Sequence, residues 1–325
     1  MPAVFSSELL AANLLSPMVL AFALGMLATV IRSDLDIPPA LHTSLSLFLL
    51  LAIGLKGGMA IAQSASGTLL IPLVGTVAAG FVTTGLAYLV LRKLVRLKRV
   101  DAAAVAAHYG SVSAVTFIAA REVATRSVGE VEGLMVALLV ALELPAILFG
   151  LWLGQRGGHE SRLWLSLREV LTGRTMLLLG GGLLIGWIAG PERTARVTPL
   201  FVNLFDGVLM LFLLDLGMAA ARRLRDLRKV GWPFIAFALL MPMVHGIAGA
   251  WLGTALGLSV GGAAVFGAML ASASYIAAPA AVRTGLPEAN PSLYLTASLG
   301  ITFPLNLSIG IPLYLAAARY FAGGS

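Results

Sequence analysis

The stretch Gly110-Ser111-Val112-Ser113-Ala114-Val115-Thr116 is a polar break inside an otherwise apolar segment, and Ala271-Ser272-Ala273-Ser274-Tyr275 is a second one. A constant offset of 161 positions pairs Ser111 with Ser272 and Ser113 with Ser274. Apolar segments that Gly or Ser interrupts at matching places in two halves of a chain indicate a binding site near the middle of a membrane. The two breaks therefore predict both the fold and the site.

The composition is that of a membrane protein. Of the 325 residues, 59% are hydrophobic and 11% are charged, which is more apolar surface than a soluble domain of this size needs. The chain has no cysteine, and this excludes disulfides, thiol catalysis and thiolate metal sites. The net charge of +7 comes from Lys and Arg at the ends of apolar segments, so we expect no nucleic-acid partner. No basic segment precedes the first apolar run, and we expect no cleavable signal peptide.

Apolar runs long enough to cross a membrane as helices occur ten times. They cover approximately residues 15–32, 39–62, 68–92, 101–121, 131–154, 174–190, 198–221, 232–257, 261–283 and 291–320. The predicted fold is an all-α membrane protein with ten transmembrane helices, of which the fourth and ninth are discontinuous at the polar breaks. Residues 1–154 form a first five-helix repeat and residues 174–325 a second. Residues 155–173 form a cytoplasmic connecting loop, in which we expect a short interfacial helix.

Further matches between the two halves support an internal repeat. Gly58 pairs with Gly217, and Pro145 with Pro304, at an offset of 159. Because each half has an odd number of helices, the second copy must enter the membrane from the opposite side, which gives a 5+5 inverted repeat. With the N-terminus placed outside, 16 of the 22 Lys and Arg residues fall on the inner side. The positive-inside rule thus predicts that both termini lie outside the cytoplasm.

The breaks carry groups that bind small ions. Where two half-helices meet inside a membrane, their N-terminal N–H groups offer donors and partial positive charge to an anion. Serine and threonine hydroxyls can donate to an anion or coordinate a hard cation such as sodium. The alternative is that the small residues only allow close helix packing. The residues that we predict to bind substrate are Gly110, Ser111, Ser113, Thr116, Ser272, Ser274 and Tyr275.

Three of the charged residues in the predicted spans are singled out as candidates for a role inside the membrane: Lys56, Asp215 and Glu143. Lys56 and Asp215 occupy equivalent positions at an offset of 159, and a lone charge in the membrane core costs on the order of 3 kcal/mol. We expect the two to pair or to share a hydrated cavity; the alternative is that each extends toward the nearer interface. Glu143 lies beside Pro145. It is expected to line the site as a carboxylate for a proton or sodium, or else to bond to backbone that the proline frees.

An ordered set of motifs runs along the chain: residues 53–60, the first serine break, residues 242–246, the second serine break and residues 283–292. The last of these, residues 283–292, gives the closest match to a known family. Through this set the chain resembles the sodium-dependent bicarbonate transporter family best known from cyanobacteria. The resemblance implies a homotrimer in the bacterial inner membrane, with a scaffold domain and a moving core domain in each subunit. It also implies bicarbonate between the two broken helices and sodium beside it, with Ser111, Ser272 and Ser274 as candidate sodium ligands. Related cyanobacterial members bind a small PII-type signalling protein at their cytoplasmic face.

The chain departs from the family pattern at four places, of which two are the first break, with Ala114 and Val115 where family members have more Ser and Gly, and the connecting loop, which is shorter. Tyr275 stands where family members have an aspartate, which removes a sodium ligand, and Lys56 stands where they usually have a neutral residue. The predicted function is import of bicarbonate or a similar small anion by a sodium-coupled, elevator-type secondary transporter. The alternatives are a sodium- or proton-coupled carrier of organic anions of the bile-acid type and a sodium-independent anion uniporter. No diphosphate, histidine–metal or serine–histidine motif favours an enzyme, and we expect no cofactor beyond the coupling ion.

Overall fold

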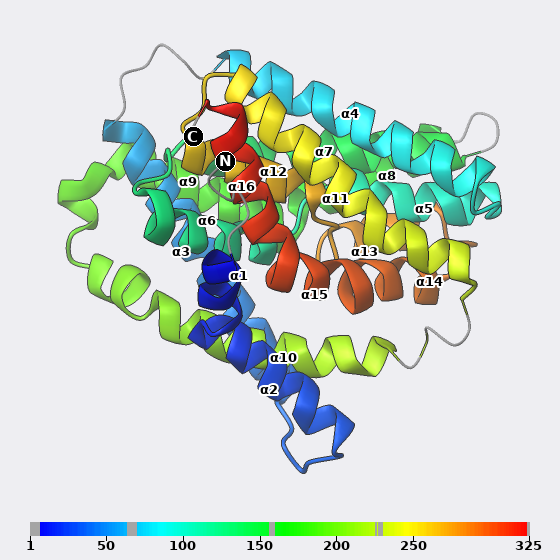
Figure 1. Cartoon of the computed structure of the whole chain (residues 1–325). Coiled ribbons are helices and arrows are strands. Elements are labelled where there is room, and N and C mark those ends of the chain that lie inside the picture. Colours follow the sequence, from blue (N-terminus) through cyan, green and yellow to red (C-terminus); the bar gives the residue numbers. More distant parts are fainter. Residues whose placement is uncertain (1–6, 64–69, 156–159, 225, 227–229, 324–325) are drawn as a thin grey trace.

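The computed structural model describes residues 7–63, 70–155, 160–224, 226 and 230–323, and over these residues the chain is helical without strands (Figure 1). The α-helices are α1 Ser7–Leu14, α2 Pro17–Val30, α3 Pro39–Gln63, α4 Leu70–Lys93, α5 Arg99–Gly110, α6 Ala114–Val128, α7 Met135–Gly154, α8 Glu160–Thr172, α9 Arg174–Thr194, α10 Phe205–Leu224, α11 Trp232–Ala255, α12 Val260–Ala271, α13 Ala278–Gly285, α14 Pro291–Leu295, α15 Phe303–Leu305 and α16 Ile311–Phe321. Three π-helical segments are η1 Pro199–Asn203, η3 Thr296–Thr302 and η4 Asn306–Gly310. The predicted all-helical class is confirmed.

Helices occupy each of the ten segments predicted to cross a membrane. Among the described residues, seven helices are long and apolar enough to do so, or eight if α1 and α2, bent by 59°, form one span. Helix α10 is not apolar enough to count as a membrane-spanning helix, because it carries four charged residues. Helix α12 is too short to count, because the second break ends it after 12 residues. The structure thus supports a multi-pass membrane protein, while the count of ten spans and the inverted orientation stay predictions.

The long helices pack in two sets. Helices α2, α3, α9 and α10 form a four-helix group, in which α3 packs on α9 and α2 on α10. Helices α4 to α7 and α11 to α16 form the break-bearing bundle, in which α5 and α12 are central. Residues 102–110 of α5 and 261–271 of α12 are all buried. In Figure 1, α2 and α10 run along the lower edge, below the bundle that contains α4, α5 and α11.

Two matched glycines make equivalent contacts inside the four-helix group. A Cβ atom on Gly58 would overlap the backbone of α9 at Leu183, and one on Gly217 would overlap the backbone of α2 at Phe22. Glycine at these positions lets the helix backbones approach closely. The second helix of each half therefore packs against the first helix of the other half, an exchange that an internal repeat produces.

The lipid-facing surface and the connecting helix agree with a membrane location. Leu24 on α2 and Ile188 on α9 are among many exposed large apolar side chains on the long helices, as expected of helices that face lipid. Helix α8 lies in the predicted connecting loop, with Trp164 exposed and the Ser166 hydroxyl donating to the carbonyl of Ala281 at 3.4 Å. Residues 156–159 of that loop lie outside the described residues.

Candidate functional site

The first polar break interrupts the helix where the sequence predicts it. Helix α5 ends at Gly110 and α6 begins at Ala114. The Ser113 hydroxyl accepts a hydrogen bond from the Thr116 N–H at 3.2 Å, which satisfies one of the free donors at the start of α6. The Ser111 hydroxyl is buried and has no hydrogen-bond partner among the described residues.

The second break repeats this local structure. Helix α12 ends at Ala271 and α13 begins at Ala278. The Ser274 hydroxyl accepts from the Ala278 N–H at 3.2 Å, so Ser274 serves α13 as Ser113 serves α6. The Ser272 hydroxyl donates to the carbonyl of Met269 at 2.8 Å, in the last turn of α12.

Two hydrogen bonds join the breaks directly. The Ser113 N–H donates to the Ser272 hydroxyl at 2.9 Å, and the Ser274 N–H donates to the carbonyl of His108 at 2.9 Å. The donors and acceptors of both hydrogen bonds are buried, and leaving a buried donor or acceptor unpaired costs free energy of folding. The structure therefore brings together two segments that lie about half a chain apart, and it holds them in one arrangement.

Asn306 supports the second break and was missed by the sequence analysis. Its side-chain amide donates to the carbonyl of Ala271 at 2.9 Å, and its amide oxygen accepts from the Tyr314 hydroxyl at 2.7 Å. This satisfies the last carbonyl of α12, which has no partner within its own helix. The available signal was a lone amide in an apolar span, two residues after the repeat-matched Pro304.

A small cavity of about 10 Å³ lies where the breaks meet, which is room for about one water molecule. Helix α7 contributes Glu143 to it, and α9 contributes Thr175, a residue that carried no sequence signal. The Glu143 side chain is buried, and its Oε2 has no hydrogen-bond partner among the described residues. The cavity is lined by Val112, Ser113, Ala114, Glu143, Thr175, Ser274, Tyr275, Ile276 and Ala277.

Tyr275 closes one side of this cavity. Its hydroxyl lies toward Ser113, is buried, and has no well-formed hydrogen bond with a described residue. Its ring meets that of Phe303 edge-on, with 5.5 Å between the ring centroids. The predicted site residues Gly110, Ser111, Thr116 and Ser272 belong to the breaks but do not line the cavity.

The cavity combines opposite electrostatic features. The N-termini of α6 and α13 both border it, through Ala114 and Ala277, and helix N-termini carry partial positive charge. A carboxyl group from Glu143 and hydroxyls from Ser113 and Ser274 reach the same space. The helix N-termini in this arrangement can bind an anion, and the oxygen atoms can coordinate a hard cation.

The predicted pairing of Lys56 with Asp215 is wrong. The carboxyl group of Asp215 instead contacts Nδ1 of His42, and no ion pair joins Lys56 to Asp215 among the described residues. His42 and Lys56 both lie on α3, 14 residues apart, which is roughly 21 Å along a helix axis. Equivalent positions in a repeat imply equivalent roles rather than contact. The Lys56 ammonium lies 4.4 Å from the ring centroid of Phe205, a cation–π contact.

Apolar helices that cross a membrane, with two broken helices meeting around ion-binding groups, define a membrane transport protein. Residues 17–319 match the model of the Na+-dependent bicarbonate transporter superfamily, and the chain belongs to that superfamily. The resemblance predicted from the motifs is therefore confirmed, and membership implies sodium-dependent bicarbonate transport at the level of the superfamily. No curated protein matches the chain. Membership in a transporter family favours a transporter over an enzyme.

Proposed function

We propose that this protein imports bicarbonate, or a similar small anion, together with sodium. One observation carries the proposal: the buried carboxyl of Glu143 and the hydroxyls of Ser113 and Ser274 share a cavity with the N-termini of two half-helices. Few membrane proteins place an unpaired carboxyl in an apolar interior without a functional reason. The same space therefore holds groups suited to both ions.

Coupling follows from the charges in this cavity. An ionised Glu143 repels an anion that approaches the helix N-termini, because like charges in a poorly hydrated site interact strongly. A sodium ion between Glu143 and the two serine hydroxyls neutralises that charge and leaves the positive helix ends free to attract bicarbonate. In this scheme Glu143 supplies the carboxylate that the family aspartate supplies elsewhere, at the place where this chain has Tyr275.

We propose alternating access by movement of the break-bearing bundle against the four-helix group, as in an elevator. Both breaks are hydrogen-bonded to each other and lie in the bundle. Thr175 is the cavity-lining residue that comes from the four-helix group. Displacement of the bundle then opens the cavity by separating it from Thr175 while leaving the two breaks intact.

A second candidate is a carrier that does not use sodium. Tyr275 and its buried hydroxyl stand between the breaks, and a phenol is a weaker sodium ligand than a carboxylate. Glu143 then couples transport to protons, or the protein is a uniporter. The cavity of about 10 Å³ has room for about one water molecule, so bicarbonate itself enters only when the cavity opens, and a bulky organic anion requires a larger opening.

The remaining features of the proposal come from the family resemblance. We propose a homotrimer in the bacterial inner membrane, with both termini outside the cytoplasm. A PII-type protein is proposed as a partner at the cytoplasmic face, which in this proposal carries α8 and the basic residues after α4. These assignments guide experiments on assembly and regulation.

The deciding experiment is uptake of radiolabelled bicarbonate into proteoliposomes with a sodium gradient, with a proton gradient and with neither. We expect sodium to drive uptake in the wild type. Glu143→Gln keeps the side-chain shape but removes the charge, and we expect it to raise the sodium concentration for half-maximal uptake at least about tenfold, which is about 1.4 kcal/mol. Glu192→Gln, at an exposed carboxyl outside the cavity, is the matched control and should match the wild type.

Each other result favours a named alternative. Uptake that follows the proton gradient and disappears in Glu143→Gln assigns the carboxyl to protons. Uptake that is indifferent to both gradients, and unaffected by Glu143→Gln, makes the protein a uniporter. Absence of bicarbonate uptake under every gradient refutes the proposed substrate.

A further inference from the structure

A second cavity lies between the two sets of helices, away from the breaks. Its volume is about 140 Å³, room for several water molecules or a small hydrated ion. Lys56 from α3 and Phe205 from α10 line one side, and Arg121 and Glu122 from α6 line the other. The cavity is therefore formed jointly by the four-helix group and the break-bearing bundle.

Two cations face this cavity without a salt bridge. Among the described residues, neither Lys56 nor Arg121 forms an ion pair or a side-chain hydrogen bond. The two are close enough for mutual electrostatic repulsion. Holding two like charges at one partly buried cavity is unfavourable unless an anion or water is placed between them.

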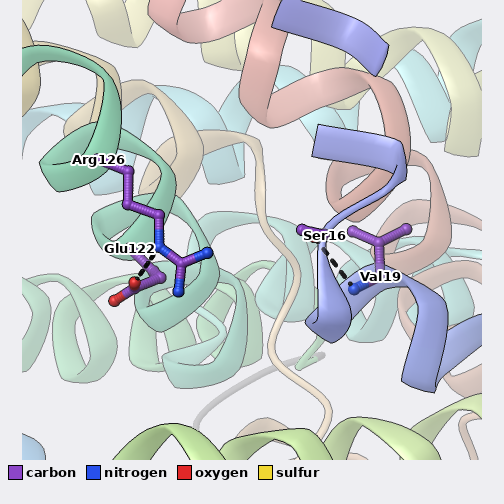
Figure 2. Close-up of polar contacts among 4 residues, drawn as sticks. All are labelled: Ser16, Val19, Glu122 and Arg126. Atoms are coloured by element: carbon purple, nitrogen blue, oxygen red, sulfur yellow. Dashed lines mark hydrogen bonds and ion pairs between the residues drawn. The ribbon is translucent and has the colours of Figure 1, made fainter. Parts of the chain in front are cut away.

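The nearby carboxylates offset the two cations only in part, because Glu122 attracts both Lys56 and Arg121 but forms its ion pair with another residue. Glu122 is engaged by Arg126, whose Nε lies 2.6 Å from Oε1 of Glu122. Figure 2 shows this pair on α6, facing the start of α2 at Ser16 and Val19. Asp206 is near enough to attract Lys56 electrostatically but forms no salt bridge with it. The charged residues that line the cavity are therefore two cations, Lys56 and Arg121, and one carboxylate, Glu122, which is already paired with Arg126.

Helix α6 connects this cavity to the first break. Ser113, Phe117 and Arg121 are spaced four residues apart and so lie on one face of the chain as it passes into α6. Arg121 and Ser113 are roughly 12 Å apart along this direction. Phe117 lines this second cavity and is fully buried, and along α6 it lies between Arg121 and the serine break.

We infer that the cavity between Lys56 and Arg121 is an anion-binding vestibule, which takes a small monovalent oxyanion before it passes Phe117 to the breaks. The identity of the anion as bicarbonate rests on the proposed function, whereas the site itself rests on the two unpaired cations. Arg121 offers a planar set of donors that suits an oxyanion, and Lys56 adds a mobile point charge.

The absence of cysteine allows a direct electrostatic test. Thr125 lines the cavity and is exposed, so Thr125→Cys introduces a single thiol there. The rates of its reaction with a sulfonate-bearing and a trimethylammonium-bearing methanethiosulfonate are measured in reconstituted protein. We expect the anionic reagent to be favoured, and bicarbonate to slow its reaction at least about twofold relative to gluconate at equal ionic strength.

Variants that remove one positive charge test whether Lys56 and Arg121 cause the preference for the anionic reagent. On the Thr125→Cys background, Lys56→Gln or Arg121→Gln should each lower the ratio of anionic to cationic rates by about tenfold, as expected for removing one nearby unit charge. Lys56→Arg keeps the charge and should keep the ratio. A single thiol at Ser44→Cys, exposed at the start of α3 and outside this cavity, should show neither the preference nor the protection.

Uptake in the same liposomes separates this inference from the proposed function. An unchanged rate ratio in both neutral variants, or no slowing by bicarbonate, overturns the vestibule even where sodium-driven uptake is intact. Protection by bicarbonate in protein that shows no uptake supports the vestibule and refutes the transport proposal.

Discussion

Replacing Ser272 by alanine is expected to destabilise the junction between the two breaks. The Ser272 hydroxyl accepts from the Ser113 N–H at 2.9 Å and donates to the Met269 carbonyl at 2.8 Å. The alanine leaves the buried Ser113 N–H without an acceptor, which costs about 1–3 kcal/mol. With about 2.1 cal/mol/K of unfolding entropy per residue, 325 residues give ~0.7 kcal/mol/K. The expected loss in Tm is therefore about 1.5 to 4.5 °C.

Ser111→Ala is the matched control, because the Ser111 hydroxyl is equally buried but has no described partner. Its removal leaves no group unpaired, so we expect Tm to fall by less than about 1 °C. Thermal unfolding of the purified protein is followed by the fluorescence of its five tryptophans, and bicarbonate uptake is measured alongside. Ser272→Ala should lower both Tm and uptake, whereas Ser111→Ala, whose side chain lines neither cavity, should change Tm little. Equal Tm values for the two variants would refute the structural role of the cross-break hydrogen bond.

Two further predictions concern the four-helix group. Gly217→Ala should destabilise the protein by about 1–3 kcal/mol, because its Cβ overlaps the backbone of α2; Gly181→Ala, with open space around its Cβ, should be neutral or stabilising by about 0.5–1 kcal/mol. Thermal unfolding compares the two, and the same sign for both would contradict the close approach. A double-mutant cycle on His42 and Asp215 should give a coupling energy of about 0.5–3 kcal/mol, and one on Lys56 and Asp215 a value near zero. A larger coupling in the second cycle would restore the pairing that the structure argues against.

The sequence predicted the breaks well because their signal is local and repeated. Ser113 caps α6, and the Ser274 hydroxyl accepts from the first N–H of α13; both contacts reach only three or four positions along the chain. Glu143 was found for a similar reason, since a carboxyl in an apolar run is conspicuous. The site's remaining contacts are tertiary, and the bond from the Ser113 N–H to Ser272 could not be read from either segment alone.

The error over Lys56 has the same physical origin. A repeat offset states which residues are equivalent, but contacts depend on which helix lies beside each of them. Because α3 and α10 each pack on the first helix of the opposite half, Lys56 faces Arg121 across the interface with α6. Asp215 meets His42, about four turns of α3 away. The pattern therefore located the charges inside the predicted spans correctly and assigned them the wrong partners.

The cross-break hydrogen bonds also restrict how the site can open. If the breaks separated during transport, the Ser113 and Ser274 N–H groups would both lose buried acceptors, at about 1–3 kcal/mol each. Withdrawal from Thr175 breaks no hydrogen bond that the structure shows, and Lys56 and Arg121 line the second cavity from the two sides of the same interface. The proposed motion between the two sets of helices therefore breaks fewer of these hydrogen bonds than separation of the breaks does, and in that proposal the two breaks move as a unit and the proposed vestibule changes shape.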